Sequence, residues 1–282
     1  MTERLADITA RIDGIRQLGS VVNAMKGIAA ARAGMARSQV LAVDGYAAGI
    51  AAAMAQVLGP DAAPALGPAD AADGPAGLLL FCAEQGFAGA FSERVLDDLG
   101  TGLAPETLFM VGTRGVSVAA SRGLIPHRTA ALPSQSTGIP ELADRIVAGI
   151  QEDVAEGRMR RLDIVSTDWT SGRPEIVRQG LLPLDLSDLP PPLRDRPLMQ
   201  LPEGTLMDSL AGDYLHALVC RAALHAFAAE NQARMEAMTA AASQIARELD
   251  AFEATLRRVR QEAITAEIIE LGTGVISVGG AR

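Results

Sequence analysis

The turn Glu84–Phe91 is the first stretch whose residue types and spacing could do chemistry. Its sequence, Glu-Gln-Gly-Phe-Ala-Gly-Ala-Phe, lies between a short apolar run and a stretch with helical character. Glycines in this position can let a phosphate approach the amides at a helix N-terminus. The turn lacks a Gly-x-Gly pattern, however, and Gly112-Thr113-Arg114 supplies no acid for a ribose after the next apolar run. We expect a tight strand-to-helix turn, with nucleotide binding as the alternative.

A single lysine, Lys26, excludes two kinds of site. A Walker phosphate loop needs a lysine before serine or threonine, and a Schiff-base enzyme needs a lysine in a pocket. The three histidines, His127, His216 and His225, lack the four-residue spacing of a helical metal site. We therefore predict no catalytic residue, no metal site and no cofactor.

The cysteines and one acidic segment also favour structural interpretations. Cys82 and Cys220 are far apart, and Cys82 lies in an apolar run, which predicts a buried thiol. Asp168-Trp169-Thr170-Ser171 closes a predicted strand, where α/β enzymes often place active groups. Because no histidine or second carboxylate is near it in sequence, we expect a turn there.

Composition limits the partners. A net charge of -9 and a pI near 4.9 argue against nucleic-acid binding, which needs a basic face. The N-terminus has neither the apolar core of a signal peptide nor the acid-poor character of a transit peptide. No window of 18 uncharged apolar residues is present, so we expect a soluble, cytoplasmic protein without membrane insertion.

The elements that must organise the chain are two long proline-free runs. In the run from Thr205 to Leu271, apolar residues alternate at spacings of three and four, which is typical of a coiled-coil seam. Thr205 with Asp208 predicts an N-cap, and Gly272 and Gly274 predict the end of the helix. The predicted seam residues are Met235, Met238, Ala242, Ile245, Leu249, Phe252, Leu256, Val259 and Ala263.

The run from Thr2 to Leu58 has the same alternation, interrupted by Gly19, which predicts an antiparallel pair of helices. At about 1.5 Å per residue, the C-terminal run would span roughly 100 Å, longer than a domain of this size, so much of it should project. The repeat of the N-terminal run consists of Leu5, Ile8, Ile12, Ile15, Val22 and Met25.

Between the two runs, short apolar stretches alternate with helical ones, which predicts an α/β domain with a mostly parallel sheet and helices on both faces. The expected strands are 77–83, 107–112 and 162–167, with a possible fourth at 175–184, and the expected helices are 88–99, 114–122 and 139–156. The predicted organisation is an N-terminal coiled-coil helix 1–58, a linker 59–76, an α/β (Rossmann-like) domain 77–202 and a C-terminal coiled-coil helix 203–282.

Four motifs resemble the gamma subunit of F-type ATP synthases, and together they span the chain. Glu230 to Met238 (Glu-Asn-Gln-Ala-Arg-Met-Glu-Ala-Met) resembles that family's Glu-His-x-Ala-Arg-Met-x-Ala-Met, with Asn231 where histidine is common. Arg260 to Glu270 resembles its C-terminal signature Arg-Gln-x-x-Ile-Thr-x-Glu-Ile/Leu-x-Glu. Ala24 to Arg32 is similar to its Ala-Met-x-x-Val-Ala-Ala-x-Lys segment, and Gln85 to Phe91 is a looser version of its Arg-Gly-Leu-Cys-Gly-Gly-Leu turn.

The chain also departs from this family pattern. Ala88 replaces the usual cysteine, Ala90 replaces a usual glycine, and lysines are almost absent. The proline-containing link is also unlike the typical one. These differences indicate a divergent member and leave the C-terminal signature intact.

The resemblance implies the central stalk, or rotor, of a proton-translocating ATP synthase. It implies no catalytic site in this chain, and partners that are three alpha and three beta subunits, the epsilon subunit and the membrane c ring. It places the protein at the cytoplasmic face of the bacterial inner membrane, as a peripheral protein. The implied catch contacts with the catalytic subunits are Arg258, Arg260, Gln261, Thr265, Glu267, Met25 and Lys26.

Two other functions remain open at this point. A coiled-coil adapter would have an extended shape and a helical partner. A nucleotide-binding α/β enzyme using the turn Glu84–Phe91 would bind its ligand as an isolated chain.

Overall fold

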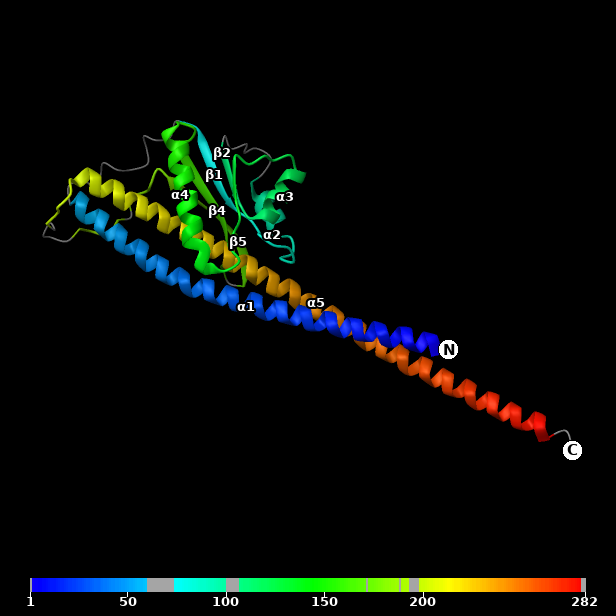
Figure 1. Cartoon of the computed structure of the whole chain (residues 1–282). Helices are drawn as coiled ribbons and strands as arrows, with labels where there is room; N and C mark the ends of the chain where they lie inside the picture. The colour runs from blue at the N-terminus through cyan, green and yellow to red at the C-terminus, as the bar shows by residue number, and fades with distance from the viewer. Residues whose placement is uncertain are drawn as a thin grey trace. The chain divides into compact units, whose positions relative to one another are not determined.

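Two long helices begin and end the folded chain. The computed structural model describes residues 2–59, 74–99, 107–170, 172–187, 189–192 and 198–279. Helix α1 spans Thr2–Leu58, as predicted, and helix α5 spans Glu203–Gly279 (Figure 1). The predicted linker 59–76 lies outside the described residues from 60 to 73. The predicted domain boundaries stay a prediction.

The N-cap predicted at Thr205 and the helix end predicted at Gly272 and Gly274 are wrong, whereas the predicted start of the segment at residue 203 agrees with α5. Helix α5 begins two residues before Thr205, because the Pro202 carbonyl already accepts a helical hydrogen bond from the Leu206 amide at 3.0 Å. It also continues through Gly272 and Gly274 to Gly279. Glycine permits a left-handed helix stop but does not impose one.

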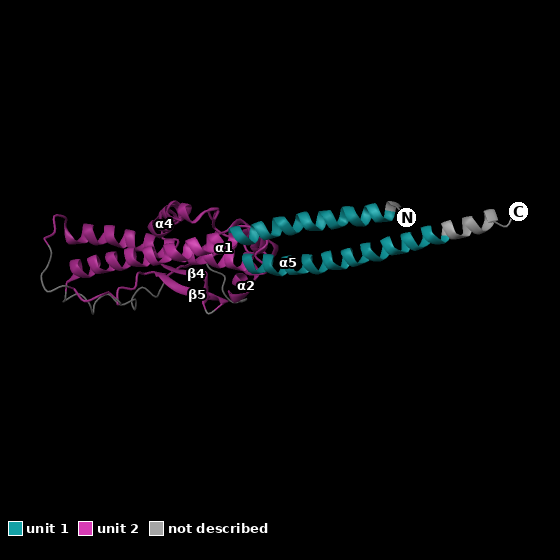
Figure 2. Ribbon diagram, turned by 90° about the horizontal axis from the view of Figure 1, so that it is seen from below, with its two compact units in different colours: residues 1–28, 235–282 teal, residues 29–234 magenta. Residues whose placement is uncertain are grey.

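The chain divides into two compact units, both of which contain parts of α1 and α5. Unit 1 comprises residues 1–28 and 235–282, and unit 2 comprises residues 29–234 (Figure 2). In unit 1, Arg16 pairs with Glu253 at 2.7 Å, while Gly19 lies against Ile245. Contacts that advance along α1 therefore go backwards along α5, and the two helices are antiparallel.

The face that α1 buries follows the three-four alternation over most of its length. Because small residues dominate it in unit 2, the helices can approach closely there. The buried apolar residues of α1 are Ile12, Val22, Ala29, Ala33, Ala36, Val40, Ala47, Ile50, Met54, Ala55 and Val57. One 18-residue window of α1, with mean hydropathy 1.5, is apolar enough to cross a membrane by length and composition, a criterion that core helices of soluble proteins also meet.

Unit 2 contains a mostly parallel five-stranded sheet in the order β3-β2-β1-β4-β5. The first four of these strands are parallel, and β5 pairs antiparallel to β4. The strands are β1 (Ala76–Phe81), β2 (Thr107–Val111), β3 (Arg128–Ala130), β4 (Arg161–Thr170) and β5 (Arg173–Leu182). The sequence prediction missed β3, because three residues with no apolar run give no strand signal.

Helices cover both faces of the sheet, as predicted (Figure 1). Alternation along β1 directs Leu79 and Phe81 toward α4, α5 and α1, while Leu78 and Leu80 face α2 and α3. Pro140 occupies the first turn of α4, where a missing N–H costs nothing. The helices are α2 (Phe91–Asp98), α3 (Thr113–Ser121) and α4 (Ile139–Ala155), with a 3₁₀ turn at Ser136–Gly138.

A buried ion network ties α4 to the neighbouring segments of unit 2. The Asp153 side chain is 1% exposed and accepts hydrogen bonds from Arg128 Nε at 3.1 Å and from Arg158 Nη2 at 2.7 Å. Burial by itself raises the pKa of this carboxyl group, but the hydrogen bonds and charges of the two arginines outweigh it and lower the pKa below its usual range.

Two glycines of α1 allow a matched test of the seam. A Cβ added at Gly27 meets no atom within 4 Å, whereas one added at Gly19 lies 3.3 Å from Ile245 Cγ2. Gly27→Ala should raise the free energy of unfolding by about 1 kcal/mol through helix propensity. Gly19→Ala should gain less or lose stability because Ile245 must shift. Urea unfolding followed by circular dichroism measures both, and equal gains would contradict this packing.

The Asp153 network predicts an acid-sensitive contribution to stability. Asp153→Asn should lower the free energy of unfolding at neutral pH by about 3 kcal/mol, because two arginines lose their buried carboxylate. Because the pKa of Asp153 is lower in the folded protein than in the unfolded chain, ionised Asp153 stabilises the fold at pH values above the unfolded-state pKa of about 3.9. This contribution to the free energy of unfolding is lost as the pH falls through the folded-state pKa of Asp153. The variant should therefore lose less stability than the wild type between about pH 4 and the folded-state pKa.

Urea unfolding at several pH values measures this difference. Asp97→Asn is the control, because Asp97 pairs with Arg122 on the surface, where its side chain is 66% exposed. This control should change stability by less than about 0.5 kcal/mol. Equal effects of the two substitutions at neutral pH would contradict the importance of the buried network.

Candidate functional site

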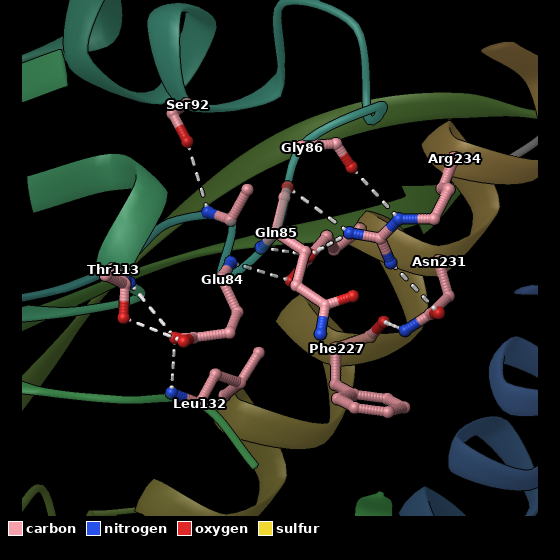
Figure 3. Close-up of polar contacts among 11 residues, drawn as sticks. Glu84, Gln85, Gly86, Ser92, Thr113, Leu132, Phe227, Asn231 and Arg234 are labelled. Carbon is pink, nitrogen blue, oxygen red and sulfur yellow. Dashed lines mark hydrogen bonds and ion pairs between the residues drawn. The ribbon is translucent and has the colours of Figure 1, made fainter. Parts of the chain in front are cut away.

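A buried polar cluster joins α5 to the turn that follows β1 (Figure 3). Glu230 and Arg234 are four residues apart, so they lie on one face of α5 and form an ion pair. Their side chains are only 3% and 7% exposed. Asn231 lies between them and is also buried. We call these three residues the α5 anchor.

The α5 anchor binds the backbone of the turn. The Glu230 carboxylate accepts hydrogen bonds from the amides of Glu84 and Gln85, each at 3.2 Å. Arg234 donates through Nε to the Gly86 carbonyl at 3.2 Å and through Nη2 to the Gln85 carbonyl at 3.3 Å. Two charged side chains thus satisfy both the donors and the acceptors of one short backbone segment.

Asn231 orients the arginine of the α5 anchor. Its side-chain nitrogen Nδ2 donates to the Phe227 carbonyl at 2.8 Å, and its side-chain oxygen accepts from Arg234 Nη1 at 3.2 Å. The guanidinium group is therefore held by the carboxylate of Glu230, by the amide of Asn231 and by two backbone carbonyls. These partners fix the orientation of the guanidinium group, so that its N–H donors point at the turn.

The Glu84 side chain extends the cluster to the next two strands. Its carboxylate accepts hydrogen bonds from the Thr113 amide at 3.0 Å, from the Thr113 hydroxyl at 2.7 Å and from the Leu132 amide at 2.8 Å. Gly112 precedes Thr113 with φ 109°, and a Cβ there would lie 2.4 Å from the Cys82 carbonyl oxygen. Only glycine fits this close approach of β2 to the end of β1.

These contacts occupy three of the amides at the carboxyl ends of β1 and β2. In dinucleotide-binding folds, free N–H groups at the strand-to-helix turn receive the phosphate. Here the amides of Glu84 and Gln85 donate to Glu230, and the amide of Thr113 donates to Glu84. The tight turn expected here is replaced by a longer connection, residues 82–90, which runs through bends from β1 to α2 and works as an attachment point between α5 and the sheet.

A second group of polar residues lines a groove of 270 Å³ between β4, β5, α1 and α5. Asp168 accepts a hydrogen bond from the Trp169 amide and lies 2.9 Å from Nδ1 of His225. The turn predicted for residues 168–170 is wrong, since β4 extends to Thr170, and Ser171 lies outside the described residues. The hydroxyl of Ser166 also faces this groove, but among the described residues no hydrogen bond joins it to His225. The arrangement therefore does not activate a nucleophile.

The two cysteines are free and buried in the structure, as predicted for Cys82. Burial raises the pKa of the Cys82 thiol to about 12, with the charges of Glu230 and Glu93 adding to the effect. Burial likewise raises the pKa of Cys220 to about 11, with a smaller effect of Asp144. Within the described ranges, no group of three or more His, Cys, Asp or Glu side chains could hold a metal ion.

The predicted seam residues all lie on α5 in unit 1, and each is buried or half-buried. Met238 and Val259 are buried, and the guanidinium of Arg11 lies 5.2 Å from the centre of the Phe252 ring. The half-buried members are Met235, Ala242, Ile245, Leu249, Phe252, Leu256 and Ala263.

The predicted catch residues form two separate groups in unit 1. Arg258, Arg260, Gln261, Thr265 and Glu267 are exposed on α5, whereas Met25 and Lys26 are half-buried on α1. The pairing of Arg16 with Glu253 sets the register of the helices. At 1.5 Å per residue, Arg258 lies about 20 Å along the helix axis from Met25. The structure does not bring the two groups together.

The α5 anchor was not predicted as a site, although its residues lie in one of the motifs. The available signal was an acid and a base four residues apart in the alanine-rich stretch Ala222–Ala237. Their partners are 145 to 149 residues away in sequence, so no local pattern could identify them.

Comparison with known proteins gives a consistent result. A family model described as ATP synthase matches residues 4–278. The chain is 28% identical over 310 residues to the ATP synthase gamma chain of Frankia casuarinae, covering 100% of this chain and 98% of that relative. It is 28% identical over 283 residues to the ATP synthase gamma chain of Moorella thermoacetica, covering 96% and 97%.

Solved structures share the fold. A chain of the Euglena gracilis mitochondrial ATP synthase, in a structure of its OSCP, F1 and c-ring parts, matches with TM-score 0.68 and 15% identity over 100% of this chain and 97% of that one. A chain from the central stalk and c ring of the Tetrahymena thermophila mitochondrial ATP synthase matches with TM-score 0.58 and 17% identity, covering 78% and 99%. With the family model spanning almost the whole sequence, the chain belongs to the ATP synthase family, among whose members are these gamma chains.

Proposed function

We propose that this chain is the central stalk rotor of an F-type ATP synthase and couples rotation of a membrane c ring to conformational changes in the catalytic subunits. The observation that carries this proposal is that the family model covers both long helices together with the α/β unit between them. An adapter made of coiled coil alone would not require a five-stranded sheet attached to its helices by buried charges.

The proposed partners are three alpha and three beta subunits, the epsilon subunit and the c ring. The chain contributes mechanical coupling and supplies no catalytic site of its own. The occupied amides of the turn after β1 and the unactivated Ser166 support this division of labour. We place the complex at the cytoplasmic face of a bacterial inner membrane, with this chain as a peripheral component and protons as the transported ion.

We further propose that the exposed residues of the C-terminal signature contact the catalytic subunits. Arg258, Gln261 and Thr265 are spaced by three and four residues and share one face of α5, while Arg260 and Glu267 lie on another. Arginine suits such contacts because its planar donors engage carboxylates bidentately. Met25 and Lys26 would form a second contact further along the paired helices.

Native mass spectrometry of the tagged protein, purified from gently solubilised host membranes, tests the assignment. One copy of this chain with three copies each of two nucleotide-bearing subunits is the expected result. A lone chain, a homodimer or a complex with one helical partner would overturn the assignment to a rotor.

The catch residues have a direct mutational test. Arg260→Ala with Gln261→Ala should lower ATP-driven proton uptake in inverted membrane vesicles, because loss of about 1 kcal/mol of interface energy would weaken the contact with the catalytic subunits about fivefold. The helical signal and midpoint of unfolding of the isolated chain should stay unchanged, because surface substitutions are mild.

A matched control comes from the same helix. Arg247→Ala with Gln244→Ala removes the same two residue types from exposed positions of α5 in unit 1, outside the signature. This control should leave proton uptake unchanged. Equal losses in both double variants, or loss of helical signal in the first, would count against a specific contact.

A further inference from the structure

We propose that the α5 anchor is the attachment through which α5 and the sheet transmit torque to each other, with Glu230 and Arg234 as its positioning residues. This inference rests on the proposed rotor function. It assigns a mechanical role to contacts that lie entirely within unit 2.

The other contacts of α5 with the sheet in unit 2 are mostly apolar. Its polar contacts there include Arg221 with Gln179 and His225 with Asp168, whose α5 side chains are 31% and 30% exposed. Burial of apolar surface is non-directional, so small shifts of a helix exchange one apolar contact for another. Hydrogen bonds to charged groups depend on distance and angle, and each contributes about 1.5–3 kcal/mol.

The α5 anchor supplies directional contacts whose charged side chains are buried. Glu230 accepts from two backbone amides and Arg234 donates to two carbonyls of the same turn, so four hydrogen bonds must break together when α5 turns about its axis. It lies in the last turn of α5 within unit 2, directly before Met235, where the helix continues into unit 1. This is the place where a load carried along α5 first meets the sheet.

The turn that receives this load is itself fixed. Phe87 has φ 63°, the only positive φ of a non-glycine residue in the described part of the chain, and its side chain is 69% exposed. The Ser92 hydroxyl accepts from the Ala83 amide at 3.2 Å, and Glu84 connects the turn to the start of α3 and to the residues after β3. The load is therefore distributed over the carboxyl ends of three neighbouring strands.

The same level of α5 is also connected to α1. Arg37 Nη2 donates to the Gln232 side chain at 3.0 Å, and Gln232 lies between Glu230 and Arg234 in sequence. Both long helices are therefore joined to each other and, through the α5 anchor, to the sheet. Apolar packing alone would leave the rotational position of α5 less well defined.

The experiment uses the complete complex in inverted vesicles and compares proton uptake with ATP hydrolysed. Arg234→Lys is the decisive variant, because lysine keeps the charge beside Glu230 but cannot donate to two carbonyls from a planar group. Glu230→Gln is the stronger change. Both should incorporate into the complex and should reduce proton uptake per ATP by about twofold or more.

Asp153→Asn is the matched control. It also removes a buried carboxylate paired with arginines in unit 2, but its partners are Arg128 and Arg158, away from α5. It should lower the stability of the isolated chain by a similar amount and leave proton uptake per ATP unchanged.

The outcomes separate this inference from the rotor assignment. Normal proton uptake per ATP in assembled Arg234→Lys complexes would overturn the torque role and leave the rotor assignment intact. Equal uncoupling by Asp153→Asn would also overturn it, because general destabilisation would then explain the loss. Absence of the wild-type chain from any such complex would overturn the rotor assignment itself.

Discussion

Close packing of small apolar side chains along one face of each long helix is the constraint on which the structure depends. The buried face of α1 is rich in alanine, and it keeps the three-four alternation through both units. Alanine contributes little apolar area, so stability must come from the length of the contact and from how closely the helices approach. This explains why a chain with only 3% aromatic residues can maintain two helices of 57 and 77 residues.

Packing of this kind fixes which faces meet but resists sliding poorly, and the polar contacts compensate for that. Arg16 with Glu253 and Arg37 with Gln232 set the register of α1 against α5 within their respective units. Glu230 and Arg234 then fix α5 against the sheet through the backbone of a turn, so the contact does not depend on flexible surface side chains. The charged groups are few, and they lie where the apolar contacts leave rotation or translation undetermined.

The sequence was sufficient for the features that repeat along the chain and insufficient for those that depend on distant pairs. Absence of proline and a regular repeat predicted α1 to the residue, and apolar runs located β1, β2 and β4. Strand β3 was missed because Arg-Thr-Ala carries no apolar pattern. Helix α5 begins before the predicted N-cap Thr205 because the Pro202 carbonyl already accepts the helical hydrogen bond from the Leu206 amide. Gly19, which interrupts the pattern in sequence, proved to be a position where Ile245 fits closely. The pairing of Asp168 with His225 and the α5 anchor join residues 57 to 149 positions apart, which local patterns cannot reveal.

The carboxylates at the carboxyl end of the sheet have a consequence for the surroundings of this protein. Glu230 and Glu84 accept hydrogen bonds from three amides at this end of the sheet. They behave as ligands tethered to their own receptor, at an effective concentration of about millimolar or higher that dilution cannot reduce. An external anion would have to compete with a permanently attached carboxylate for each of these amides.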